Sequence, residues 1–110
     1  MRAPAPLFAA LGDETRLRLL ARLSAGGPQS IARLTEGSDV TRQAVTKHLR
    51  VLAGAGLVAG ARRGRETRWT LRPARLELAR RFLDRMAERW SERLLALERH
   101  LETMGDGGPG

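Results

Sequence analysis

The sequence predicts a mainly α-helical domain of five helices and one β-hairpin, on the basis of three observations. Apolar residues recur at helical spacing in segments that glycine and proline residues separate. A short turn at residues 37–39 joins two of these helices. The segment after the second of them changes to the two-residue alternation of strands. Two helices joined by a short turn and followed by a hairpin make the expected fold class a winged helix-turn-helix.

The first two predicted helices lie on either side of Gly12. Residues 4–11 open with proline and carry an apolar face made of Leu7, Phe8 and Leu11. Asp13 is of a residue type that caps helices, and it precedes the second helix. Three leucines recur there at three-residue spacing and are expected to face the core: Leu17, Leu20 and Leu23. Residues 26–28, Gly-Gly-Pro, end this helix.

The third and fourth helices form the predicted helix-turn-helix. The third runs from about Ser30 to Glu36 and turns Ile31 and Leu34 inward. Thr41 is suited to cap the fourth helix, which continues to about residue 55.

The fourth helix separates into two faces when its residues are placed at about 100° intervals. One face is an apolar stripe made of Val45, Leu49 and Leu52. The other carries donors and acceptors without an acid: Arg42, Gln43, Thr46, Lys47 and Arg50. Such side chains reach base edges and phosphates in a major groove. The alternative is an ordinary amphipathic surface helix, which would more often mix acids with bases.

A hairpin follows, with strands expected at residues 57–62 and 67–71 and a turn at 63–66. Alternation directs Trp69 toward its packed side. Three arginines lie at or beside the turn: Arg62, Arg63 and Arg65. They suit a DNA backbone or an adjacent groove. A solvated arginine-rich loop is the alternative.

A long last helix is predicted from Pro73 to about Met104. Its apolar residues step by three or four positions and form a continuous seam: Ala79, Leu83, Met86, Trp90, Leu94, Leu97 and Leu101. A helix of roughly 30 residues is about 45 Å long, more than one small domain easily covers. We therefore expect a second chain on the seam, anchored by Phe82 and Trp90, with the apolar face of the first helix completing the dimer interface. Trp90 could instead belong to the chain's own core or line a ligand pocket.

The chain as a whole fits one small DNA-binding domain. Residues 1–104 are expected to form it, with residues 73–104 as the dimerisation helix and 105–110 as a disordered tail. Seven of its 20 basic residues, against one acid, lie in residues 41–68, as expected of a surface that neutralises phosphates. The absence of an apolar span or signal sequence predicts a cytoplasmic protein without membrane contact. With no cysteine, two distant histidines and no phosphate loop, no enzyme is predicted.

Residues 11–71 resemble the ArsR-type (arsenical-resistance repressor) winged helix-turn-helix regulators. Three motifs carry the resemblance: LGDETRLRLLARL, QAVTKHLRVLAGAGLV and RRGRETRWTL. It implies a homodimer that binds a palindromic operator in double-stranded DNA and represses transcription. By position it assigns DNA contacts to Thr41, Arg42, Gln43, Thr46, Lys47, His48 and Arg50, and wing contacts to Arg62, Arg63 and Arg65. Because His48 lies off the basic face, packing or a phosphate contact is favoured for it over base reading.

The chain departs from the metal-sensing members of that family. Ser30 and Ala32 stand at the positions that match the Cys-x-Cys pair of the family's thiol sensors, and the last helix has His100 alone, near Glu98 and Glu102. No metal ligand set and no cofactor are therefore expected, as in the family's metal-independent members. A repressor that responds to an unidentified small organic molecule remains open, as does an RNA-binding or protein-docking winged helix.

Overall fold

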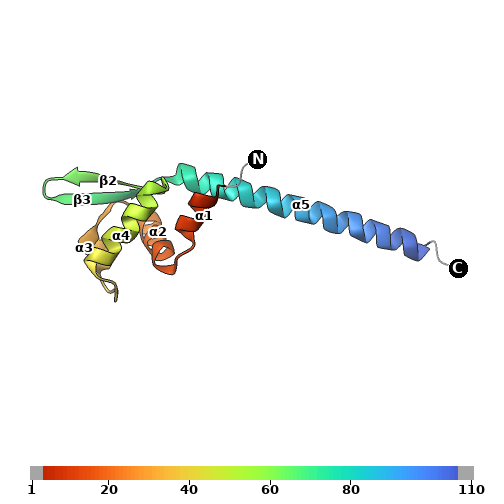
Figure 1. Cartoon of the computed structure of the whole chain (residues 1–110), viewed down its shortest axis with the longest axis horizontal. Helices are drawn as coiled ribbons and strands as arrows, with labels where there is room; N and C mark the ends of the chain where they lie inside the picture. The colour runs from red at the N-terminus through yellow and green to blue at the C-terminus, as the bar shows by residue number, and fades with distance from the viewer. Residues whose placement is uncertain (1–3, 107–110) are drawn as a thin grey trace. The chain divides into compact units, whose positions relative to one another are not determined.

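The computed structural model describes residues 4–106, except for the side chain of Asp106. Contacts divide the chain into two compact units, Met1–Ala79 and Arg80–Gly110. The elements are α1 (Ala5–Leu11), α2 (Glu14–Gly26), β1 (Gln29–Ser30), α3 (Ile31–Thr35), α4 (Arg42–Gly54), β2 (Val58–Arg63), β3 (Glu66–Leu71) and α5 (Pro73–Asp106). The predicted order of five helices with a hairpin between the fourth and fifth is confirmed (Figure 1).

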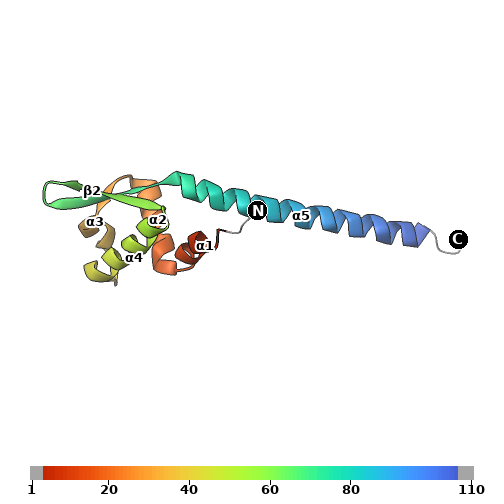
Figure 2. The same cartoon turned by 45° about the horizontal axis from the view of Figure 1, so that its top comes forward.

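The first unit packs α2, α3 and α4 against one side of the hairpin, as Figures 1 and 2 both show. Its most deeply buried large side chains come from three of its segments: Leu34, Val45, Leu49, Leu52 and Leu57. The apolar stripe predicted on the fourth helix is therefore in the core. Leu7 of α1 is buried there too, while Phe8 and Leu11 are partly buried and pack on it.

The core face of α2 differs from the predicted one. Leu17 is 50% exposed, and Leu19 is buried in its place beside Leu20 and Leu23. Steps of three residues drift around a helix, so Leu17 lies about 120° from Leu23, whereas Leu19 lies about 40° from it. The three-residue spacing was therefore the wrong guide to the buried face.

The sheet has three antiparallel strands in the order β1-β3-β2, so the predicted two-stranded wing lacked one strand. β1 is only two residues long, Gln29 and Ser30, and pairs with Trp69 and Arg68. Two residues are too few for alternation to reveal a strand. The hairpin turn is also tighter than predicted, with Gly64 and Arg65 between the strands, because Gly64 adopts a positive φ of 61°.

Trp69 packs where the sequence predicted, on the covered side of the sheet, and is 9% exposed. A Cβ built on its cross-strand partner Gly60 would come within 3.2 Å of the indole ring. Glycine at position 60 therefore gives the ring its space.

Three helices begin at side-chain caps. The side chains of Asp13, Ser30 and Thr41 accept hydrogen bonds from the backbone N–H three residues on, at 3.0, 3.2 and 3.1 Å. Asp13 and Thr41 are thus confirmed as caps. Ser30, expected as the first residue of a helix, is its cap instead.

The helix α5 begins at Pro73 as predicted and ends at Asp106. Gly105 and Asp106, assigned to the tail from the sequence, are therefore helical, and residues 107–110 lie outside the described residues. The second unit consists of the part of α5 after Ala79. Phe82 is half-buried, and the other large apolar residues of this unit are exposed: Leu83, Met86, Trp90, Leu94, Leu95, Leu97, Leu101 and Met104.

Candidate nucleic-acid interface

The helix α4 has a buried face and a polar face, as its sequence predicted. Val45, Leu49 and Leu52 are at most 1% exposed. Five of the predicted DNA contacts are exposed: Thr41, Arg42, Gln43, Lys47 and Arg50. The side of the helix that does not pack on the core is therefore open to a ligand along its length.

Thr46 lies on the same face but is half-buried. Its hydroxyl donates a hydrogen bond to the backbone oxygen of Arg42 at 2.7 Å. The donor is thus used within the helix, and Thr46 offers a ligand its methyl group and the remaining acceptor capacity of its oxygen.

The electrostatics of α4 are one-sided. Arg42, Lys47 and Arg50 carry its positive charge, and the helix contains no acid. The acids nearest in sequence, Glu36 and Asp39, belong to the turn before it. A helix of this kind attracts phosphates and presents arginine and glutamine, which form paired hydrogen bonds with guanine and adenine edges.

His48 is placed differently from the other candidate residues. Its Nδ1 lies 3.8 Å from Asp13 Oδ2 and 3.3 Å from Arg16 Nη1, and its side chain is 24% exposed. It therefore contacts the start of α2, away from the basic face. This placement favours the packing role over base reading.

Arg16 is a residue that sequence reasoning missed. Its Nε donates to the backbone oxygen of Ala10 at 2.6 Å, and its Nη2 donates to that of Ala9 at 3.2 Å. Together with the contact to His48, these bonds join α1, α2 and α4. No sequence pattern marks this role, because an arginine in an amphipathic helix resembles a solvated residue.

Asp13 completes this cluster. A hydrogen bond from the backbone N–H of Arg16 holds the pKa of its carboxyl group below the ordinary value, and the nearby charges of Arg16 and His48 act in the same direction. A lowered pKa means that folding favours the ionised carboxylate. Its contribution to stability is therefore present above the ordinary pKa and is lost as the pH falls through the folded-state pKa.

We expect Asp13→Asn to lower the free energy of unfolding near neutral pH, although asparagine can still cap the helix. Urea titrations of both proteins at several pH values measure the effect. The difference should shrink steadily as the pH falls below 3.8, the ordinary pKa, because the Asp13 carboxyl group is the titrating group that the variant lacks. A difference that stayed constant down to about pH 2 would rule out an ionic contribution.

The wing arginines lie on two faces of the hairpin. In the register Arg62 pairs with Thr67, on the same face as Trp69, whereas Arg63 pairs with Glu66 on the other face. Arg65 is in the turn. All three arginines are exposed, and Arg62 Nε donates to the backbone oxygen of Gly64 at 3.3 Å. Arg63 thus lies opposite an acid across the strands, whereas Arg62 and Arg65 have no acid as a cross-strand partner.

Within residues 4–106, no group of three or more histidine, cysteine, aspartate or glutamate side chains is arranged to hold a metal ion. In the same residues, no helix is both long and apolar enough to cross a membrane.

A helix-turn-helix with a capped, acid-free second helix and an arginine-rich hairpin defines a winged helix-turn-helix DNA-binding protein. A helix-turn-helix domain model matches residues 11–61. The HTH-type transcriptional regulator Rv2034 of Mycobacterium tuberculosis is 34% identical over 105 residues, which cover 96% of this chain and 94% of the relative. The chain belongs to the ArsR-type winged helix-turn-helix transcriptional regulators, and so to a family of regulators rather than enzymes.

Two further relatives agree with this assignment. The arsenical resistance operon repressor of Escherichia coli is 28% identical over 105 residues, covering 96% of this chain and 90% of the relative. The solved structure of an ArsR-like transcriptional regulator from Rhodococcus sp. RHA1 is 40% identical, with a TM-score of 0.75, over 87% of this chain and 90% of that one.

Proposed function

We propose that this regulator is a homodimeric repressor that binds an inverted-repeat operator in double-stranded DNA without a metal cofactor. The observation that carries the proposal is the exposed, acid-free face of α4, held on the core by a completely buried stripe. In this proposal α4 enters the major groove and the wing lies along the neighbouring backbone. A protein that binds operator DNA would act in the cytoplasm.

The exposed seam of α5 supports the dimer. Trp90 is 64% exposed, and Leu94 and Leu97 on the same helix face are 44% and 52% exposed. A continuous apolar surface of this kind is unfavourable in water and marks an interaction site. A second copy is the occupant that a two-fold operator needs.

We expect α1 to contribute less to this dimer than α5. Leu7 is only 4% exposed within the chain itself, and Phe8 and Leu11 are partly buried on the same core. Most of the apolar area available to a partner therefore belongs to α5. Phe8 and Leu11 would lie at the edge of the dimer interface.

Repression follows from the position of a bound dimer on a promoter. Two copies of α4 related by a two-fold axis would enter successive major grooves about one helical turn, roughly 34 Å, apart. A protein bound across such a site excludes other proteins from it. The relative named as an operon repressor supports this direction of control over activation.

Gln43 is the side chain that we assign most firmly to base reading, because its amide can pair with both hydrogen-bonding groups of adenine. We expect Gln43→Ala to reduce discrimination between the operator and its variants by about 1–3 kcal/mol at one base pair of each half-site. Fluorescence anisotropy with the operator and single-base variants measures this loss. An equal loss of affinity on operator and random DNA would remove Gln43 from the base-reading residues.

Arg65→Ala is the matched comparison, because Arg65 is exposed at the tip of the wing. It should weaken binding to all sequences by a similar factor and lower the slope of log affinity against log salt by about one per wing. If Arg65→Ala instead changed the preferred sequence, the wing would be reading bases or groove shape.

A further inference from the structure

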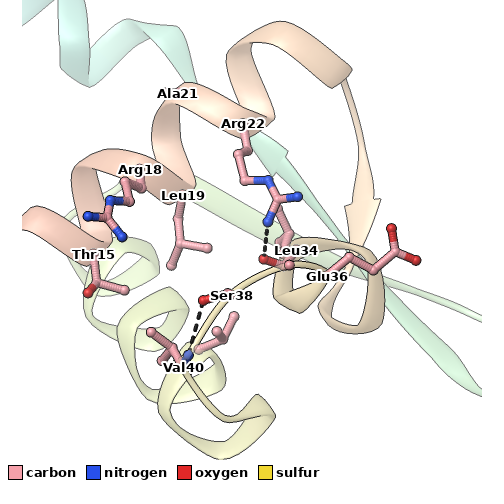
Figure 3. A pocket seen from close by; sticks show the side chains of 11 residues that line it. Thr15, Arg18, Leu19, Ala21, Arg22, Leu34, Glu36, Ser38 and Val40 are labelled. Atoms are coloured by element: carbon pink, nitrogen blue, oxygen red, sulfur yellow. Dashed lines mark hydrogen bonds between the residues drawn. The ribbon is translucent and has the colours of Figure 1, made fainter.

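A cleft lies between α2 and the turn that leads into α4 (Figure 3). Its volume is about 380 Å³, within the range of small-molecule sites. It belongs wholly to the first unit and is separate from the polar face of α4. It is lined by Thr15, Arg18, Leu19, Ala21, Arg22, Leu34, Glu36, Gly37, Ser38, Val40 and Val45.

The inner wall of the cleft is apolar. Leu19, Leu34 and Val45 are core residues that reach it from three helices, and Val40 covers it from the turn. Figure 3 shows Leu19 pointing from α2 toward the turn that carries Ser38 and Val40. A ligand here would therefore place an apolar body against aliphatic side chains.

One cation is available beside that wall. Arg22 Nη1 donates to the backbone oxygen of Leu34 at 2.7 Å, which fixes the guanidinium between α2 and α3 (Figure 3). A guanidinium has five N–H donors, and this bond uses one of them. The remaining donors can pair with the two oxygens of a carboxylate.

The other charged residues of the lining are less suited to that task. Arg18 is already paired with Glu14 at 2.8 Å. Glu36 points away from Leu19 and Val40 in Figure 3, so its charge does not face the apolar wall. The cleft thus combines an aliphatic wall with one positioned guanidinium.

We propose that this cleft binds a small organic carboxylate, with its carboxylate on Arg22 and its apolar body against Leu19, Leu34 and Val40. The turn that forms one wall is held by a hydrogen bond from the backbone N–H of Val40 to Ser38 Oγ at 3.1 Å. It continues directly into Thr41, the cap of α4. A ligand wedged between α2 and this turn shifts the start of α4 and weakens its fit to the groove. This regulatory step rests on the proposed DNA-binding function, whereas binding of the carboxylate does not.

The first experiment measures binding to the free protein. Methyl-labelled protein is titrated with benzoate and, as its uncharged match, benzamide, while the NMR signals of Leu19, Leu34, Val40 and Val45 are followed. Benzoate should shift these signals saturably, and benzamide should bind about tenfold more weakly because it cannot form the charge-assisted pair. Absence of saturable shifts with benzoate, or equal binding of benzamide, would overturn the proposal.

Three variants locate the site. Arg22→Met should weaken benzoate binding about tenfold and leave benzamide unchanged. Ala21→Phe, at an exposed position on the cleft, should block both compounds by filling the space. Arg33→Met removes an exposed arginine outside the lining and should change neither. Benzoate binding that survived both Arg22→Met and Ala21→Phe would place the ligand elsewhere.

The second experiment tests the regulatory step with operator DNA. Saturating benzoate should lower the operator affinity of the wild type at least threefold and leave that of Ala21→Phe unchanged. Unchanged wild-type affinity despite the NMR shifts would overturn the regulatory step. Failure of the protein to bind DNA at all would refute the proposed function while the benzoate titration still stood.

Discussion

Replacing Trp90 with glutamate is expected to convert the proposed dimer into a monomer. Trp90 is 64% exposed within the chain and lies at the middle of the apolar seam of α5. A carboxylate there would have to be buried against an apolar surface in each subunit, which is costly when the charge has no partner. Sedimentation equilibrium of wild type and variant measures the change.

Ser91→Glu is the control for this experiment, because Ser91 is the exposed neighbour of Trp90 and lies off the seam. It adds the same charge to the same helix and should leave the dimer intact. Circular dichroism should show equal helix content in all three proteins. A Trp90→Glu protein that sedimented as a dimer would show that another surface joins the subunits.

Loss of the dimer should also weaken operator binding. In the proposed dimer the two copies of α4 would act as one unit, so binding of the second half-site would be intramolecular. Its loss costs about 10²- to 10⁴-fold in affinity without any change to a DNA contact. Half-site affinity should be nearly unchanged, which separates lost avidity from damage to α4.

Among the substitutions proposed for this protein, Leu49→Ala should cause the largest decrease in the free energy of unfolding. Leu49 is 0% exposed and lies in the stripe that holds α4 on the core. Removing a completely buried leucine side chain costs about 2–5 kcal/mol, a large part of the roughly 5–15 kcal/mol that keeps a small domain folded. Urea unfolding followed by circular dichroism measures the loss.

Val51→Ala provides the comparison on the same helix. Val51 is 42% exposed, so its truncation leaves no closed cavity and should change stability by about 0.5 kcal/mol or less. Equal destabilisation by the two substitutions would contradict a helix α4 that buries Leu49 and exposes Val51.

The parts of the fold that follow local rules could be predicted from the sequence. Thr41 and Asp13 are capping residues at helix starts, and the stripe of α4 follows helical periodicity closely, so both were located correctly. The alternation around Trp69 likewise gave the covered face of the wing. These features depend on residues within one or two turns of each other.

Features that depend on tertiary contacts could not be predicted in the same way. The strand β1 exists because Gln29 and Ser30 pair with β3, far away in sequence. Arg16 acts through backbone oxygens of α1 and a histidine of α4, and no spacing rule identifies such partners. Leu17 was misassigned because a short leucine-rich helix offers more than one apolar spacing.

Among the candidate DNA-binding residues, too, some positions follow from local periodicity and others depend on tertiary contacts. Exposure of Arg42, Gln43 and Arg50 follows from the helix period alone. The placement of Arg62 and Arg63 on opposite faces of the wing depends on the strand register. That register could not be read exactly, because the predicted turn was two residues longer than the observed one. The cleft beside Arg22 is formed by segments from three helices and a turn, so it could not be predicted from the sequence.

Selection of bound sites from a pool of random double-stranded DNA tests the central claim most directly, since it probes binding, symmetry and spacing together. We expect enrichment of an inverted repeat whose half-site centres lie about one helical turn, roughly 10 base pairs, apart. Recovery of unrelated sequences, or of a single half-site without a symmetric partner, would contradict a dimer that reads DNA through paired α4 helices.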